Sequence, residues 1–239
     1  MDVGIIGSGQ IGSILARRLA ALGHQVRIAN SRGPESLAAL AAEAGATAST
    51  VEQAASARDV VIVTIPQNAV RELPRGLFAG SRAIVVETGN YYPARDGRID
   101  AIDEGLTDSE WVAQVLGRPV VKAFNNIGAK SLDSRGVPRG TPGRVSLSVA
   151  GDDPAAKQVV LRLLDELGFD GLDAGSLAES WRQQPGTPAY CADLDRTALQ
   201  AALSKPDAAG IASRRQAANE HARPLLEARQ PRATNPRSV

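Results

Sequence analysis

Three glycines near the N-terminus have the spacing of a phosphate-binding turn. The segment Gly7-Ser8-Gly9-Gln10-Ile11-Gly12 reads GxGxxG, follows a short apolar run and opens a helical pattern. In this arrangement Gly7 permits a tight turn, Gly9 lets the backbone approach a pyrophosphate, and Gly12 lets the helix pack closely on the strand. Free N–H groups at the start of the helix attract the anion. The motif therefore predicts a dinucleotide-binding site.

The residues after the next apolar run indicate which dinucleotide is bound. Enzymes that use NAD usually carry an acidic residue there, which accepts hydrogen bonds from the 2′-hydroxyl of the ribose. This chain has Asn30-Ser31-Arg32 instead, with no acid before Glu35. A carboxylate would repel a 2′-phosphate, whereas a hydroxyl and a guanidinium can bind one. We therefore expect NADP(H); the alternative is that Arg32 is a solvated loop residue.

Groups that could act on a second substrate occur later in the chain. Lys122 lies in the otherwise apolar run Val120–Phe124, from which it could donate a proton to a carbonyl or extend into solvent at a sheet edge. Asn125 and Asn126 could hydrogen-bond a carboxamide or a carbonyl, or could simply form the turn after this strand. The other candidate proton donors are Tyr91, Tyr92 and Tyr190.

Alternating strand and helix patterns must position these residues. Apolar or β-branched runs predict strands at Asp2–Ile6, up to Ala29, and at Val60–Ile65, Ala83–Glu87, Pro119–Phe124, Val145–Ala150 and Phe169–Leu172. Helices are predicted at Pro34–Ala44, Thr50–Ser56, Asp153–Leu167, Asp193–Leu203 and Asp207–Arg229. The alternation predicts an α/β fold, a doubly wound and mostly parallel Rossmann-like sheet with a small C-terminal helical extension.

Loops that follow the strands should carry the ligand site, because such sheets bind ligands beyond the carboxyl ends of their strands. Most of the few aromatic side chains outside the predicted strands fall in two of these loops, at Glu87–Pro93 and Trp181–Tyr190. They could line a flat apolar ligand site or anchor the loops by packing on the domain. The sequence leaves both alternatives open.

Composition and length favour a cytoplasmic enzyme. The 239 residues carry a net charge of +1, which gives no footprint for nucleic acid or a membrane surface, and the single cysteine fits a reducing compartment. No Cys/His/Asp cluster predicts a metal site. We expect an NADP-binding domain with acceptor loops over residues 1–203, a C-terminal helical extension over 204–229 and a disordered tail over 230–239.

Several of these motifs together resemble one known family. The fingerprint, the Ser31-Arg32 pair, the loops Asn90–Pro93 and Ala123–Ile127 and the segment Gln184–Tyr190 resemble the NADPH-dependent reductases of coenzyme F420, a deazaflavin. The chain is more similar to the bacterial dinucleotide-binding branch of this family, whose fold is shared by the cytoplasmic domains of transmembrane metalloreductases. The resemblance covers about residues 1–203.

The resemblance implies roles for individual residues. Ser8, Gln10 and Ile11 would line the fingerprint loop, and Ser31 and Arg32 would hold the 2′-phosphate. The remaining cofactor-binding positions expected from it are Asn30, Thr64, Ile65, Pro66, Asn90 and Asn125.

The expected reaction is direct hydride transfer between the nicotinamide and a deazaflavin- or flavin-like acceptor. Such a transfer needs two stacked rings with reacting carbons about 3–3.5 Å apart, and it needs no protein acid. The alternatives are reduction of a small carbonyl or imine, with Lys122 or a tyrosine as acid, and a non-catalytic NADP(H)-sensing module. By analogy with related dinucleotide enzymes we expect a homodimer, with a small-molecule hydride acceptor as the other partner.

Overall fold

The centre of the molecule is a six-stranded parallel sheet. The structure is a computed structural model that describes residues 1–205 and 208–229. Strands follow the order β3-β2-β1-β4-β5-β6, and each neighbouring pair is parallel. The strands are β1 (Asp2–Ile6), β2 (Gln25–Ala29), β3 (Thr47–Ala48), β4 (Val60–Val63), β5 (Ile84–Glu87) and β6 (Val121–Lys122). The order reverses between β1 and β4, where sheets of this kind bind ligands. The predicted doubly wound, Rossmann-like fold is confirmed.

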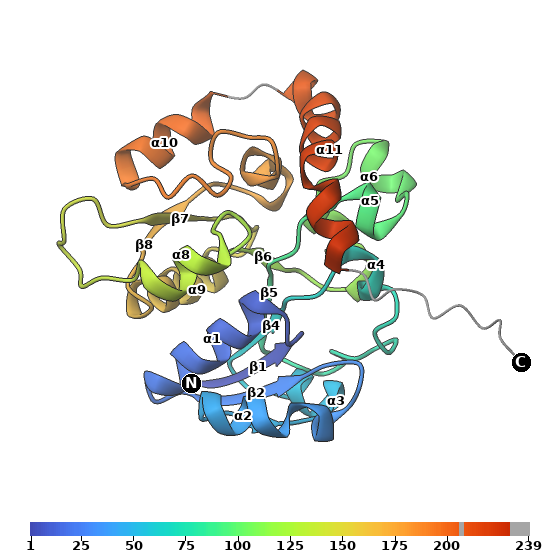
Figure 1. Cartoon of the computed structure of the whole chain (residues 1–239), viewed down its shortest axis with the longest axis vertical. Helices are drawn as coiled ribbons and strands as arrows, with labels where there is room; N and C mark the ends of the chain where they lie inside the picture. The colour runs from blue at the N-terminus through green and yellow to red at the C-terminus, as the bar shows by residue number, and fades with distance from the viewer. Residues whose placement is uncertain (206–207, 230–239) are drawn as a thin grey trace, which may run out of the picture.

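Helices cover both faces of this sheet (Figure 1). Neighbouring residues of a strand point to opposite faces, so Ile5 packs in one apolar cluster and Ile6 in the other. This explains why β1 and β4 are continuous apolar runs. The helices are α1 (Gln10–Ala21), α2 (Ala38–Ala44), α3 (Val51–Ala55), α4 (Gln67–Val70), α5 (Pro93–Asp96), α6 (Asp100–Asp103), α7 (Asp108–Leu116), α8 (Ala129–Ser134), α9 (Pro154–Glu166), α10 (Arg196–Ser204) and α11 (Ile211–Arg229), with 3-10 turns at Pro34–Leu37, Leu177–Gln183 and Ala208–Gly210.

The last two strands form a separate small sheet. β7 (Ser146–Val149) and β8 (Asp170–Asp173) pair in parallel with each other, and β7 is linked to the main sheet by one antiparallel bridge between Lys122 and Ala150. The predicted helix between them is α9, which begins at the Asp153 cap and buries Val160, Leu163 and Leu164. Sequence periodicity predicted these strands but could not assign them to a second sheet.

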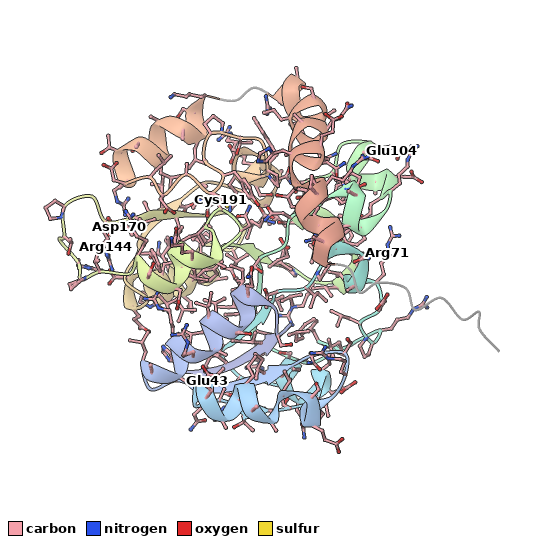
Figure 2. All side chains as sticks on the ribbon, in the orientation of Figure 1. Glu43, Arg71, Glu104, Arg144, Asp170 and Cys191 are labelled. Carbon is pink, nitrogen blue, oxygen red and sulfur yellow. The ribbon has the colours of Figure 1, made fainter. Side chains whose placement is uncertain are left out.

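Polar contacts hold this second unit together. Figure 2 shows the Arg144 and Asp170 side chains meeting at its outer end, where an Arg144 nitrogen lies 2.7 Å from an Asp170 oxygen and 2.7 Å from an Asp165 oxygen. The Arg144 side chain is 3% exposed. These ion pairs join the loop before β7, which carries Arg144, to α9 and β8, and removal of the two acids would leave the Arg144 charge buried without a partner.

The two C-terminal helices pack on different elements at the same end of the molecule (Figure 1). α10 buries Leu199 and Leu203 beside β7 and β8, and α11 lies against α5 (Figure 1). The tail predicted over 230–239 lies outside the described residues. In the described ranges, no helix is long and apolar enough to cross a membrane.

Candidate dinucleotide and acceptor site

A cleft of about 630 Å³ opens at the carboxyl edge of β1, β2 and β4. Its volume lies within the roughly 300–1,000 Å³ common for ligand pockets. The predicted residues that line it are Gly7, Ser8, Gly9, Asn30, Ser31, Arg32, Thr64, Ile65 and Pro66. The structure therefore brings together residues from three separate strand ends.

The fingerprint turn has the shape that a pyrophosphate requires. Gly7 has a φ of +120°, and a Cβ atom there would lie 2.2 Å from the Thr64 carbonyl oxygen. A Cβ at Gly12 would lie 2.0 Å from the Gly7 carbonyl oxygen, whereas one at Gly9 would meet no described atom within 4 Å. α1 begins after Gly9 with no side-chain cap and no acid in its first turn. Its N-terminal N–H groups therefore face open space that fits an anion.

Asn30 joins the fingerprint loop to the turn that carries Ser31 and Arg32. Its Oδ1 accepts the Arg32 N–H at 2.9 Å, and its Nδ2 donates to the Ser8 hydroxyl at 3.2 Å. Ser31 and Arg32 are exposed, and no carboxylate in the described ranges pairs with the Arg32 guanidinium. Asn30 therefore positions the two residues that are free to meet a 2′-phosphate.

The opposite wall of the cleft was not predicted. It is formed by Thr50, Val51 and Glu52 at the start of α3 and by Ala69, Glu72, Leu73 and Pro74 around the end of α4. Backbone and Thr50 hydrogen bonds at the start of α3 lower the pKa of Glu52, so this exposed side chain is an anion within the cleft. The Thr50–Gln53 capping box after β3 was the sequence signal that could have located this wall.

A buried ion pair lies at the carboxyl ends of β5 and β6. The Lys122 ammonium is 2.8 Å from a Glu87 carboxylate oxygen and also donates to the Gly89 carbonyl, while the other Glu87 oxygen accepts the Gly89 N–H. Ser109 donates to Glu87 at 2.7 Å. The Lys122 side chain is fully buried. The Lys122 side chain therefore neither extends into solvent nor lines the cleft. Lys122 and Glu87 together hydrogen-bond the carbonyl and the N–H of Gly89.

Next to Gly89, three amide side chains form a hydrogen-bonded network. Asn90 and Asn125 are joined by an Asn125 Nδ2 to Asn90 Oδ1 bond of 3.0 Å and an Asn90 Nδ2 to Asn125 carbonyl bond of 3.1 Å. Gln183 Nε2 donates to Asn125 Oδ1 at 2.8 Å. Asn90 and Asn125 thus lie together, beside the cleft and not among its lining residues. The structure does not place Gln10 or Ile11 in the cleft either: Gln10 lines a hollow near α8, and Ile11 packs on the core.

A further amide, at Gln67, is a residue that sequence reasoning missed. Its side chain is fully buried at the start of α4, and neither Oε1 nor Nε2 has a hydrogen-bond partner among the described residues. A Cβ at Gly89 would lie 2.3 Å from Gln67 Oε1, so the Gln67 amide packs directly against the backbone of the loop after β5. Only its position after Pro66, at a strand end, hinted at a role.

The aromatic residues of the loops divide into two groups. Tyr91 is 1% exposed, packs in the core, and its hydroxyl accepts the Ile99 N–H at 3.0 Å. Tyr92 and Tyr190, from loops 98 residues apart, join hydroxyls at 2.8 Å. Burial raises the pKa of both phenols, so each keeps its proton at neutral pH. Tyr91 anchors a loop, whereas the Tyr92–Tyr190 pair is a proton-bearing group.

Comparison with known proteins gives this geometry a family. Residues 2–91 match the family model described as NADP oxidoreductase, coenzyme F420-dependent. The solved structure of hypothetical protein SMa0349 from Sinorhizobium meliloti is 34% identical, with a TM-score of 0.68, over 82% of this chain and 96% of that one. The chain belongs to this family of NADP oxidoreductases. The expected family membership is confirmed.

Two other relatives extend the comparison. A provisionally assigned F420-dependent NADP reductase of Arthrobacter sp. FB24 is 25% identical, with a TM-score of 0.63, over 75% of this chain and 87% of that one. The metalloreductase STEAP3 of Rattus norvegicus is 31% identical over 74% of this chain and 34% of its own length. The chain spans half or less of the length of the curated relatives that it matches. No cluster of metal-ligating side chains occurs in the part of the chain that the structure describes.

Proposed function

We propose that this protein transfers hydride between NADP(H) and a deazaflavin- or flavin-like acceptor. The observation that carries the proposal is the enclosure of Lys122, whose ammonium is fully buried between Glu87 and Gly89. A carbonyl substrate develops an alkoxide that needs an acid, whereas transfer between two rings needs only proximity and stacking. The Arthrobacter relative is named as a reductase of this kind, which supports the proposal.

The residues of the cleft fit the cofactor. The N–H groups at the start of α1 would hold the pyrophosphate, Ser31 and Arg32 the 2′-phosphate, and Thr64–Pro66 the ribose and nicotinamide. Bound NADPH would supply the hydride. The protein would hold the nicotinamide beside Thr64–Pro66 and exclude water with the loops after β5 and β6, which the Asn90–Asn125 pair joins.

One observation favours the second candidate, reduction of a small carbonyl or imine. The Tyr92 and Tyr190 hydroxyls meet at 2.8 Å, and the Tyr190 hydroxyl also interacts with the Cys191 side chain. In this reaction an O–H of the pair would protonate the substrate after hydride transfer. The raised pKa of both phenols keeps them protonated at neutral pH, as a proton donor must be.

Cofactor titration, followed by turnover assays with candidate acceptors, distinguishes these functions. Nicotinamide fluorescence gives the affinities for NADPH and NADH, after which deazaflavin, FMN and a panel of carbonyls are added to the NADPH complex. Oxidation by a ring acceptor that survives Tyr92→Phe and Tyr190→Phe supports the first candidate. Carbonyl reduction that both substitutions abolish supports the second. Tight NADPH binding with no turnover of any acceptor supports the non-catalytic NADP(H)-sensing module.

The expected homodimer and cytoplasmic location stay predictions. Sedimentation equilibrium of the purified chain tests the first of them.

A further inference from the structure

Helix α11 is attached to the loop that follows β5. Asn219 Oδ1 accepts the Ala94 N–H at 2.8 Å, and Asn219 is 7% exposed. The Arg215 guanidinium donates to the Ile102 carbonyl oxygen at 3.2 Å and lies 5.5 Å from the centre of the Tyr91 ring. Arg215 and Asn219 are four residues apart, so they share one face of the helix. These contacts attach α11 to the segment that follows β5.

The same helix rests on the second aromatic loop. Gly186 has a φ of +84°, and a Cβ there would lie 2.6 Å from the Arg214 carbonyl oxygen. The α11 backbone therefore touches the loop with no room for a side chain between them. Trp181 and Ile211 line a small hollow beside this contact. α11 thus joins two loops that are about ninety residues apart in the sequence.

Both loops lie at the carboxyl ends of β5 and β6, because Asn90 bonds to Asn125 and the Cys191 N–H donates to the Asn126 carbonyl oxygen at 3.0 Å. Asn90 directly precedes Tyr91, and the Tyr92 and Tyr190 hydroxyls connect the loops at 2.8 Å. In contrast, no described residue of α11 lines the dinucleotide cleft. A change on α11 should therefore reach the acceptor without reaching NADP(H).

We propose that Arg215 and Asn219 are positioning residues for the hydride acceptor. They hold the loops after β5 and before α10 at one separation, and so set the spacing of Asn90 and the Tyr92–Tyr190 pair, beside which the acceptor would bind. This inference rests on the proposed function, because it assumes that an acceptor binds there.

The test compares four variants of the full chain. Asn219→Leu removes the acceptor of the Ala94 N–H, whereas Asn219→Asp keeps it. Arg215→Met removes the guanidinium contacts. Gln216→Leu, on the exposed side of the same helix, is the matched control. The measurements are the NADPH Kd, the kcat and KM for the acceptor, and hydrogen exchange of the Ala94 amide.

We expect Asn219→Leu and Arg215→Met to raise the acceptor KM about fivefold to tenfold, with the NADPH Kd unchanged within about twofold. Ala94 exchange should accelerate about tenfold in Asn219→Leu, and Asn219→Asp and Gln216→Leu should behave like the wild type. Faster exchange with an unchanged KM would overturn the positioning role. If no acceptor is turned over by the wild type, the proposed function fails by itself. In that case, unchanged Ala94 exchange in Asn219→Leu would separately show that Asn219 does not hold the loop after β5 in place.

Discussion

The two halves of the main sheet build their ligand-facing edges in different ways. Beyond β1, β2 and β4 the edge is an open cleft, formed by backbone N–H groups and by exposed side chains such as Ser31 and Arg32. Beyond β5 and β6 the edge is closed, and buried side chains bond to one another, as in the Glu87–Lys122 ion pair and the Asn90–Asn125 amides. The first half is prepared to receive charge from a ligand, and the second is prepared to hold loops in place. Substitutions in the first half should therefore change binding, and those in the second should change stability.

The largest effect is expected at Lys122. Lys122→Met leaves the Glu87 carboxylate buried without its ion-pair partner, which should lower the free energy of unfolding by about 3–5 kcal/mol. Chemical denaturation at pH 7 measures it. The double variant Glu87→Gln/Lys122→Met removes both charges and should recover much of the loss. If Lys122→Met is instead stable but no longer reduces carbonyls, Lys122 is a catalytic acid, and the edge beyond β5 and β6 does more than hold loops in place.

Arg32→Ala should act on binding alone. Loss of a charge-assisted contact to the 2′-phosphate should weaken NADPH binding by about tenfold to a hundredfold, with little change for NADH. Fluorescence titration of both cofactors gives the ratio, and NADH serves as the internal control. Equal losses for the two cofactors would show that Arg32 does not contact the 2′-phosphate.

The buried carboxyl of Asp108 should make the stability of the protein depend on pH. Its side chain is buried at the start of α7, Oδ2 accepts the Tyr91 N–H at 2.9 Å, and Oδ1 has no partner among the described residues. Burial raises the pKa of Asp108, so the folded protein holds this proton more tightly than the unfolded chain. The wild type should therefore lose stability as the pH rises from the unfolded pKa through the folded one.

The isosteric Asp108→Asn variant has no carboxyl at this position, so its stability should not fall with rising pH for this reason. We expect its stability advantage over the wild type to grow from about pH 4 upward and then level off, as measured by denaturant unfolding at a series of pH values. A constant difference across that range would mean that Asp108 titrates normally in the folded protein.

The smallest effect is expected at Glu52, an exposed anion in the cleft. Glu52→Gln should tighten NADPH binding by about twofold to fourfold at low salt, and the gain should disappear at high salt because exposed charges are screened. Glu43→Gln, a surface change on α2 outside the cleft, is the control. Weaker NADPH binding in Glu52→Gln would indicate that this carboxylate accepts a hydrogen bond from the cofactor.

Predictions from sequence succeeded where the signal is local. The fingerprint, the Ser31-Arg32 turn and helix α9 depend on residues within a few positions of one another, and the elements lie where the patterns placed them. The short helix α7 was not predicted, because its N-terminal turn buries polar side chains such as Asp108 and Ser109, which disguise the apolar periodicity. Tyr91 likewise could not be assigned to the core, because its hydroxyl partner is a backbone N–H eight residues away.

Residue types and their spacing alone indicated the family, the strands β1, β2, β4, β5 and β6, and the glycine-rich turn after β1. Each of these depends on residue type at short, regular spacing, which the backbone geometry converts directly into shape. The enclosure of Lys122, the bond between Asn90 and Asn125 and the contact of α11 with two loops emerge only in the folded chain. Those contacts join residues 35 to over 100 positions apart. Their partners are selected by packing in three dimensions, and no pattern along the chain records that choice.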